Sequence, residues 1–467
     1  MRIMPMPIIV LRNASVVLIC LFASAARLAA DDWPQWRGPG RDGVWNETGI
    51  IDRFAGSQIP LRWRVPVGSG YSGPTVAGGR VYLTDRQTEP REVERVLCFD
   101  WQTGQKLWGH EYPCSYANVQ YKAGPRASVT LATQRVPYRA RPISRAFALG
   151  TMGHLHCCDA ATGEVLWKKE PGRDYDVRVP VWGVASAPLV EGELLFVQIG
   201  AADGACVVAL DVQTGEEKWR ALDDRASYSA PIMIRQAGRP VLVCWTGENV
   251  VGLDPASGKT FWKHPSPPKR MVINVPTPVV DRNRLFVTAF YDGSLMLRLS
   301  EDEPRVEQLW RRCGPNERET DSLHAMISTP ILEGDYVYGV DSYGQLRCLD
   351  ARTGDRVWED LTAVPGARWS TIHMVRNHPA VGGYSIGTYP PPRGTRRIWM
   401  FNERGELVIG ELSPKGFHEI SRAKLIEPTT EQLPSRGGVC WSHPAYAYKH
   451  VFARNDRELV CASLAAE

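Results

Sequence analysis

The chain has 467 residues, of which 43% are hydrophobic and 23% charged, and its formal net charge is +4 at pH 7. Residues 1–30 contain three Arg and no acidic residue, so the rest of the chain carries 52 basic and 51 acidic side chains. This balance excludes binding driven by bulk charge and gives no reason to expect nucleic acid or an anionic membrane surface as a partner.

The first 30 residues have the order of a secretory signal peptide. Arg2 and Arg12 precede an apolar run at 16–22, and small residues follow up to Ala30. The run is too short to remain as a membrane span. We expect cleavage near Ala30 and a periplasmic or otherwise exported chain without a transmembrane span. A lipid anchor is not expected, because Ile19 precedes Cys20 where a lipoprotein signal has a small residue.

Residues 31–60 show no periodicity and are predicted to be an irregular segment, whereas residues 61–467 form one repeat domain. A hairpin pattern of Asp, Gly and Trp recurs five times between short apolar runs. The Asp opens the turn, the Gly takes a positive φ, and the Trp lies on the outgoing strand as a wedge between neighbouring sheets. The five copies are Asp100, Gly104 and Trp108; Asp159, Gly163 and Trp167; Asp211, Gly215 and Trp219; Asp254, Gly258 and Trp262; and Asp350, Gly354 and Trp358.

Two further recurring sequence features, here called marks, complete the count of repeats. A Pro opens an apolar strand in most units, and a tight turn joins the middle strands. With one Pro-less unit (SVTLA), the total is eight sheets of four antiparallel strands. The last unit supplies three strands, and LRWRVPV at 61–67 can add the fourth, which would close a ring without exposed edges. We therefore predict an all-β, eight-bladed propeller closed by an N-terminal strand. The Pro marks are Pro74, Pro188, Pro231, Pro278, Pro330, Pro379 and Pro444.

Ten cysteines follow the signal peptide, which raises the question of a disulfide framework. Cys98, Cys348 and Cys461 stand at equivalent repeat positions where other copies have Ala or Gly, so they are predicted to be small buried fillers. Cys157 and Cys158 are adjacent on a predicted strand and point to opposite faces. Their positions argue against a vicinal disulfide, although the sequence alone leaves their redox state open.

The hairpins of the form D-x-x-[TS]-G-x-x-x-W resemble those of the PQQ-like eight-bladed propellers. That superfamily holds pyrroloquinoline-quinone (PQQ) alcohol dehydrogenases and the outer-membrane assembly protein BamB. The resemblance covers residues 61–463, and the opening DDWPQWRGPGRDG is similar to that of an exported BamB-like branch. It implies the fold and leaves the function open between these classes.

A quinone dehydrogenase needs a calcium ion held by carboxylate and amide oxygens, an Asp base, an Arg near the quinone and an aromatic floor. The sequence shows none of these groups within a recognisable motif. Glu248 and Asn249 in TGENV are interpreted as middle-turn residues, and no C-x-x-C-H is present for attached haem. We predict no catalytic residues, no metal site and no cofactor, with PQQ and Ca²⁺ as the alternative.

Candidate binding residues lie just before the inner strands, where they can converge on the mouth of the ring. They are Tyr71, Arg126, Trp182, Tyr228, Asn274, His324, His373 and His443. The alternative for each is a structural role in capping a strand end. One insertion, at 132–144, adds Arg135, Arg139 and Arg141; it is either a basic partner loop or an insertion without function.

The leading hypothesis is an exported, monomeric, non-enzymatic propeller that binds or scaffolds an envelope protein or polymer. The alternatives are a PQQ-dependent alcohol or sugar oxidoreductase with a divergent site, and a carbohydrate-binding propeller.

Overall fold

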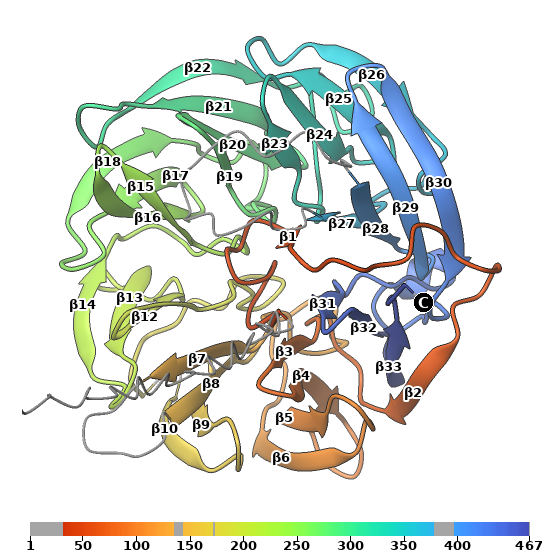
Figure 1. Ribbon diagram of the computed structural model, residues 1–467. Coiled ribbons are helices and arrows are strands. Elements are labelled where there is room, and N and C mark those ends of the chain that lie inside the picture. Colours follow the sequence, from red (N-terminus) through yellow and green to blue (C-terminus); the bar gives the residue numbers. More distant parts are fainter. Residues whose placement is uncertain (1–30, 135–142, 171–172, 378–396, 467) are drawn as a thin grey trace, which may run out of the picture.

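The computed structural model describes residues 31–134, 143–170, 173–377 and 397–466. Within these ranges the chain forms eight sheets arranged as a ring around a central channel (Figure 1), which confirms the predicted propeller. The predicted signal peptide and Arg135, Arg139 and Arg141 of the insertion lie outside the described residues. In these ranges, no helix has the length and apolar character needed to cross a membrane.

The sheets are numbered 1 to 8 along the chain, and in each the first strand is innermost. Inner strands of several neighbouring sheets contact one another around the channel. Sheet 1 comprises β3 (Thr75–Ala77), β4 (Arg80–Gln87), β5 (Val93–Asp100) and β6 (Lys106–Pro113), and sheet 2 comprises β7 (Thr130–Gln134), β8 (Ile143–Leu149), β9 (Leu155–Asp159) and β10 (Val165–Lys169). Sheet 3 comprises β11 (Leu189–Glu191), β12 (Leu194–Gln198), β13 (Val207–Asp211) and β14 (Glu217–Ala221), and sheet 4 comprises β15 (Ile232–Gln236), β16 (Arg239–Trp245), β17 (Asn249–Leu253) and β18 (Thr260–Pro265).

Sheets 5 to 7 follow the same order, and sheet 8 combines the two ends of the described chain. Sheet 5 comprises β19 (Val279–Asp281), β20 (Arg284–Ala289), β21 (Gly293–Leu299) and β22 (Val306–Arg312), and sheet 6 comprises β23 (Ile331–Glu333), β24 (Tyr336–Val340), β25 (Leu346–Asp350) and β26 (Arg356–Asp360). Sheet 7 comprises β27 (Ile372–Asn377), β28 (Arg397–Asn402), β29 (Glu406–Ser413) and β30 (Gly416–Lys424), and sheet 8 comprises β31 (Ala445–Ala447), β32 (His450–Arg454), β33 (Glu458–Ser463) and β2 (Leu61–Pro66).

The predicted closure of the ring is confirmed. Strand β2 pairs antiparallel with β33, and the register places Trp63 opposite Cys461 and Val65 opposite Leu459. Each sheet of the described ring therefore has at least four strands, sheet 7 gaining β1 (Val44–Trp45) as a fifth, and β2 covers the edge that sheet 8 would otherwise expose.

The Asp-Gly-Trp hairpins work as predicted, and the hairpin at Asp211 shows how. The Asp211 carboxylate accepts hydrogen bonds from the backbone N–H groups of Gln213 (2.8 Å) and Thr214 (3.0 Å). Gly215 has φ +72°, and a Cβ there would lie 2.7 Å from the Trp167 ring of the preceding sheet. Glycine is thus required both by the backbone and by the indole that lies against it.

The hairpin tryptophans join neighbouring sheets. The indole of Trp167 donates to the carbonyl of Val212, the residue directly after the next hairpin Asp, at 3.2 Å. The same bond recurs from Trp63 to Trp101, from Trp108 to Ala160, from Trp219 to Pro255 and from Trp310 to Ala351. The sheets that follow Trp262 and Trp358 lack the hairpin Asp. Trp358 donates to the carbonyl of Ser413 in the next sheet, whereas Trp262 donates to Gln236 Oε1 of its own sheet and meets the next sheet by packing alone.

One predicted strand is wrong. The Pro mark lies directly before the inner strand in six sheets, but in sheet 7 the inner strand is Ile372–Asn377 and ends before Pro379. Pro379 itself lies outside the described residues. HPAV at 378–381 resembles HPAY at 443–446 in sequence, but the inner strand of sheet 7 is β27, whose Ile372 and Met374 fill the core.

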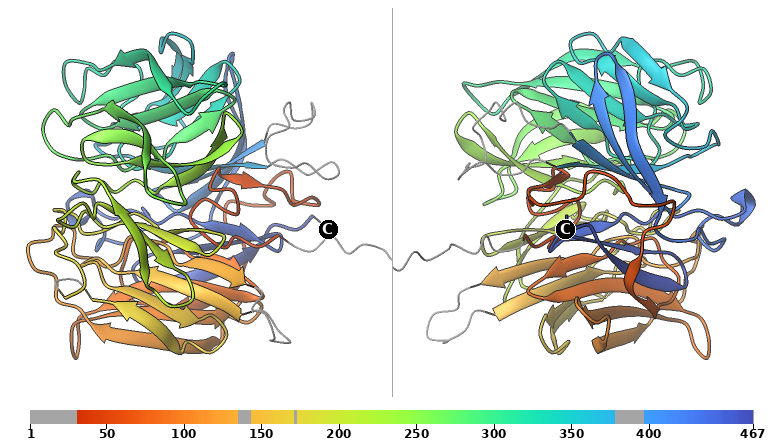
Figure 2. Two further views of the ribbon diagram at one scale, coloured as in Figure 1. Left: turned by 90° about the vertical axis from the view of Figure 1, so that its left-hand side faces the viewer. Right: turned by 45° about the vertical axis from the view of Figure 1, so that its right-hand side comes forward.

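The N-terminal segment 31–60, here called the plug, crosses one end of the channel (Figures 1 and 2). It adds β1 (Val44–Trp45) parallel to β27. Arg41, 4% exposed, donates from its guanidinium to the carbonyls of Ala187, Pro188 and Pro231 in the channel wall. Apart from β1 and isolated bridges the segment is irregular, and its lack of periodicity in the sequence gave no sign that it crosses the channel.

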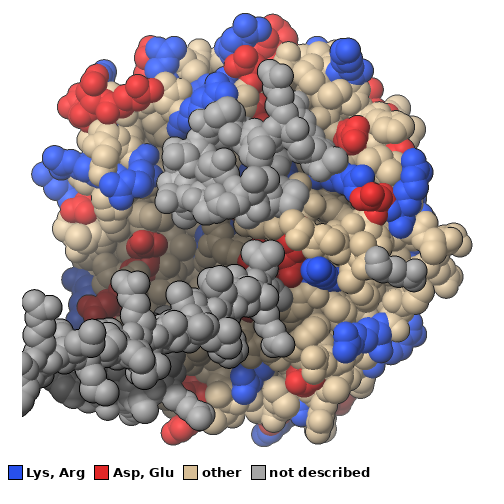
Figure 3. All heavy atoms as spheres, viewed as in Figure 1, with Lys and Arg blue, Asp and Glu red and all other residues tan. Residues whose placement is uncertain are grey.

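All ten cysteines in the described ranges are free, and nine of them are buried. Cys157 and Cys158 enter different core clusters on opposite sides of β9, as strand alternation predicts. On the plug face, basic and acidic side chains are interspersed (Figure 3), in agreement with the near-neutral composition.

Candidate functional site

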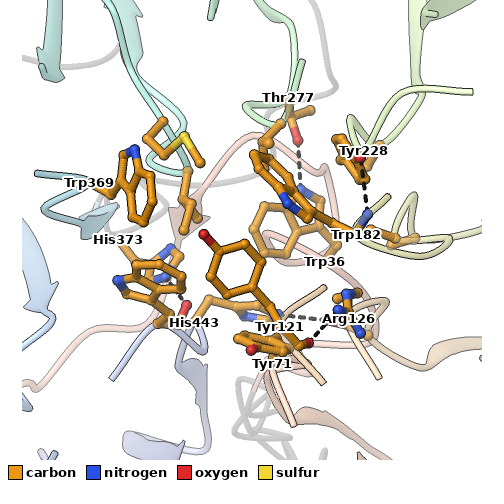
Figure 4. A pocket seen from close by; sticks show the side chains of 18 residues that line it. Trp36, Tyr71, Tyr121, Arg126, Trp182, Tyr228, Thr277, Trp369, His373 and His443 are labelled. Carbon is orange, nitrogen blue, oxygen red and sulfur yellow. Dashed lines mark hydrogen bonds between the residues drawn. The ribbon is translucent and has the colours of Figure 1, made fainter. Parts of the chain in front are cut away.

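The connections between successive sheets meet at the channel end opposite the plug, here called the mouth. A cavity of about 150 Å³ opens there (Figure 4). The structure brings six of the eight predicted candidates to its wall: Tyr71, Arg126, Trp182, Tyr228, His373 and His443.

The other two candidates do not reach the cavity. Asn274 is 2% exposed and donates from Nδ2 to the carbonyl of Thr246 at 2.8 Å. His324 is 1% exposed; its Nδ1 lies 3.0 Å from the carbonyl of Phe290, and its Nε2 accepts the backbone N–H of Gly314. Both side chains bond to neighbouring backbone, which is the structural alternative that the sequence left open.

Four aromatic residues of the wall were not among the predicted candidates: Trp36, Tyr121, Trp369 and Trp441. Trp369 stands just before β27 and was hidden by the wrong strand at Pro379. Trp441 stands three residues before Pro444, in the same kind of position. Trp36 comes from the plug, and no repeat signal marks Tyr121.

The plug forms the floor of the cavity through Trp36. Its indole donates to Thr277 Oγ1 at 2.7 Å, and its ring meets the edge of His443 at a centroid distance of 4.5 Å. The described channel is therefore closed beneath the mouth, and a ligand can enter this cavity from the mouth side only.

The two histidines of the wall are neutral structural groups at pH 7. Burial lowers the pKa of His443 to about 3 and the pKa of His373 to about 4. His443 Nε2 is 2.6 Å from Ser128 Oγ, and His373 Nε2 donates to the carbonyl of Trp441 at 2.8 Å. Across the described ranges, no three His, Cys, Asp or Glu side chains are grouped so as to hold a metal ion.

Arg126 is the cation of the wall, and both terminal nitrogens of its guanidinium are already engaged. Its guanidinium donates to the carbonyls of Gly124 (2.5 Å), Gln120 (2.9 Å) and Tyr121 (2.6 Å), and to Thr151 Oγ1 at 3.2 Å. It also lies 5.0 Å from the centroid of the Tyr71 ring. Arg126 therefore holds the mouth connection together and stacks on a wall residue.

The aromatic walls pack against one another as well as around the cavity. Trp182 and Tyr228 have ring centroids 5.2 Å apart, and the Tyr228 hydroxyl accepts the backbone N–H of Trp182 at 3.3 Å. Trp369 has φ +69°, a left-handed conformation that is unusual for a bulky residue, and its backbone N–H donates to the carbonyl of Ser342 at 2.7 Å. The Ser342 contact helps to hold Trp369 in this conformation.

The residues at the mouth do not fit PQQ with Ca²⁺. PQQ carries several carboxylates and needs cationic partners, whereas the described wall has Arg126 alone, whose two terminal nitrogens already donate to the protein. No carboxylate of the described residues lines the cavity, so the calcium ligands and the base are missing there. The space is of the size that holds one benzene-like ring.

The TGENV stretch is a turn in the structure, as interpreted. The backbone N–H of Thr246 donates to the carbonyl of Asn249 at 2.8 Å. Glu248 pairs with Arg225, and Asn249 donates to the Asp224 carboxylate at 2.6 Å. These contacts hold the connection between β14 and β15 and leave neither side chain at the cavity.

Comparison with known proteins supplies the family. The sequence profile described as "Outer membrane protein assembly factor BamB" matches residues 92–360. A protein of that name from Burkholderia pseudomallei (strain K96243) is 24% identical over 329 residues, which cover 66% of this chain and 64% of the relative. Another, from Alteromonas naphthalenivorans, is 25% identical over 235 residues, covering 47% of this chain and 54% of the relative.

The chain thus spans less than two thirds of the length of both curated relatives. Among solved structures, the crystal structure of BamB from Moraxella catarrhalis is similar with a TM-score of 0.50 at 13% identity, covering 87% of this chain and 99% of that one. This likeness shows a shared fold. A quinohemoprotein alcohol dehydrogenase from Comamonas testosteroni has a TM-score of 0.41 at 13% identity, covering 92% and 80%.

Proposed function

This chain belongs to the family described as outer membrane protein assembly factor BamB, and we propose that it is a non-enzymatic binding module of the cell envelope. In this proposal the mouth of the propeller holds a segment of a partner protein. The module works as an exported monomer, after cleavage near Ala30, and needs no PQQ or metal.

The observation that carries the proposal is the blind aromatic cavity at the mouth. Trp and Tyr side chains from several sheet connections surround it, and Trp36 of the plug closes it below. Trp, Tyr and Arg are the side chains that contribute most to binding energy at protein interfaces, especially in preformed pockets. Hydrogen bonds and ring contacts position Trp36, Trp182 and Tyr228 before a ligand arrives, so these side chains lose little conformational entropy on binding.

The chemistry of the wall supports binding over catalysis. Among the described wall residues the two imidazoles are neutral and engaged in hydrogen bonds, the guanidinium is engaged, and carboxylates are missing. A reaction would need a base, a nucleophile or an electrophile positioned at the cavity. We therefore rank the oxidoreductase alternative below the binding module.

Capture from envelope extracts tests the proposal. The natural chain should retain a specific partner protein, and Trp182→Ala should weaken that capture at least tenfold if the mouth is the contact. Leu107→Ala is the matched control, because Leu107 is 45% exposed on outer strand β6, away from the cavity wall. Equal capture by both variants would place the contact elsewhere.

A parallel assay addresses the alternatives. Purified protein supplied with PQQ and Ca²⁺ should oxidise neither alcohols nor aldoses. Steady PQQ-dependent turnover that Trp182→Ala abolishes would establish an enzyme and refute the binding module. Retention on a glycan column in place of a protein partner would favour the carbohydrate-binding alternative.

A further inference from the structure

Tyr121 occupies an unusual position inside the mouth. It lies on the connection from β6 to β7 with φ +54°, a left-handed conformation that is rare for an aromatic residue. Arg126 fixes this backbone by donating to the carbonyls of Gln120 and Tyr121. Figure 4 shows the Tyr121 ring near the centre of the group of wall residues. The chain therefore holds one of its own rings in the space that the mouth encloses.

The contacts of Tyr121 are made by its ring. Its centroid lies 5.8 Å from Trp182, 6.2 Å from Trp369 and 6.5 Å from Trp441, and the first two contacts are edge-to-face. These tryptophans come from three different connections of the ring of sheets. Within the described residues, no hydrogen bond is recorded for the Tyr121 hydroxyl. The aromatic side chains of the cavity wall, here called the cage, thus meet the Tyr121 ring in the geometry that aromatic pairs prefer.

The charges at the cage argue for a neutral occupant. Arg126 lies over the Tyr71 ring at 5.0 Å, and Arg368 lies over the Trp369 ring at 4.5 Å. Two walls of the cage therefore already carry a cation, and a quaternary ammonium ligand would meet like charge instead of free ring faces. His373 and His443 add no charge at pH 7 because burial lowers the pKa of each.

The remaining space is small. The cavity beside Tyr121 has a volume of about 150 Å³, comparable to a dry cavity that holds benzene. A space of this size holds a bare ring such as benzene, so a whole aromatic residue enters fully only when the Tyr121 ring moves aside.

We infer that the mouth is a receptor for an aromatic side chain of the partner protein, and that Tyr121 competes for the same cage as an internal occupant. This inference rests on the proposed function and specifies the chemistry that the mouth recognises. Because the internal ring must move before a ligand ring enters fully, the free protein binds less tightly than an open cage would.

Titration with N-acetylphenylalaninamide tests the inference on purified protein without any partner. Isothermal titration and Trp fluorescence should show saturable binding to the natural chain. Tyr121→Gly, which suits the positive φ and removes the ring, should bind about fivefold more tightly or better. Tyr121→Phe is the matched control: it keeps the ring, and its affinity should stay within about twofold of the natural value. Trp182→Ala should lose the binding.

Two results would overturn the inference. Unchanged affinity in Tyr121→Gly, with an unchanged melting temperature, would show that Tyr121 does not compete. Tighter binding of methyl glucoside or tetramethylammonium than of the aromatic amide would assign the cage to another ligand class. Since the titration uses small probes, the two failures differ: binding of the amide without capture of a protein would refute the proposed function and leave the aromatic specificity of the mouth and the competition by Tyr121, whereas capture without amide binding would refute this inference alone.

Discussion

At the plug end of the channel, Trp33, Trp45 and Tyr446 are 1%, 1% and 0% exposed, whereas at the mouth Tyr121, Trp182 and Trp369 keep part of their surface open. Both ends are lined by aromatic rings in edge or tilted contact. The plug end is sealed by 30 residues of its own chain, while the mouth holds a single internal ring. The comparison teaches that similar rings stabilise the fold where the chain covers them and are free to bind where it does not.

The largest expected effect comes from removing the plug. Deletion of residues 31–60 leaves β2 and the ring of sheets but uncovers the clusters around Trp33 and Trp45. Each Trp hides roughly 150–250 Å² of surface, so the free energy of unfolding should fall by at least about 5 kcal/mol. Chemical denaturation measures the loss. A change below about 1 kcal/mol would mean that the two ends do not differ as described.

A pair of single substitutions sharpens the comparison. Trp45→Ala should cost about 3–5 kcal/mol, because the indole is 1% exposed and truncation leaves a cavity. Trp182→Ala at the mouth should cost about 1 kcal/mol, since its ring is only partly covered. Urea titration of both variants measures the difference. Equal losses would show that the mouth aromatics are structural in the same way as those of the plug.

Acid should lower the free energy of unfolding through the two buried histidines of the cavity wall. The pKa values of His373 and His443 are lowered by burial to about 4 and about 3, so the unfolded chain binds protons first as the pH falls below about 6.5. Stability from these groups is therefore complete above pH 6.5 and decreases toward pH 4, by about 2 kcal/mol per imidazole at pH 5. Denaturation at pH 7.5 and pH 5 measures the slope.

A matched variant identifies the source of that slope. The double substitution His373→Gln and His443→Gln should flatten the pH dependence between pH 7.5 and pH 5. An unchanged slope in this variant would assign the acid sensitivity to other groups.

The smallest expected effect concerns the bond between the two ends. Thr277→Val keeps the shape of the side chain but removes the acceptor of the Trp36 indole. The indole N–H is only partly buried, so the loss of its acceptor should cost about 0.5–1 kcal/mol, and the floor of the cavity should loosen without unfolding the ring. Denaturation gives the cost. Unchanged stability would indicate that the floor does not depend on this bond.

The repeats were predictable because each carries its own physical reason. The Asp of each hairpin bonds the turn, the Gly accommodates the adjacent indole, and the Trp joins the next sheet, so local pattern and global fold agree. Closure through β2 followed from the three-strand last unit. These signals depend on spacing within one unit, which the sequence displays directly.

The site was only partly predictable, because its remaining residues follow no repeat. Trp36 reaches the cavity from a segment without periodicity, and Tyr121 depends on a left-handed backbone that a non-glycine residue does not announce. Trp369 was hidden because HPAV at 378–381 imitates the Pro mark of sheet 8. Positions that depend on contacts between distant segments leave no local signal for sequence reasoning to use.

The pairing of β2 with β33 also sets an order of events during synthesis. Leu61–Pro66 leaves the ribosome long before Glu458–Ser463, so its partner strand does not exist while sheets 1 to 7 are being made. The early strand and its apolar Trp63 must wait unpaired for nearly 400 residues, and the final contact closes a very long loop. Completing the ring is therefore the slow, non-local step of folding, and a chain arrested before β33 exposes an open sheet edge to aggregation and proteolysis.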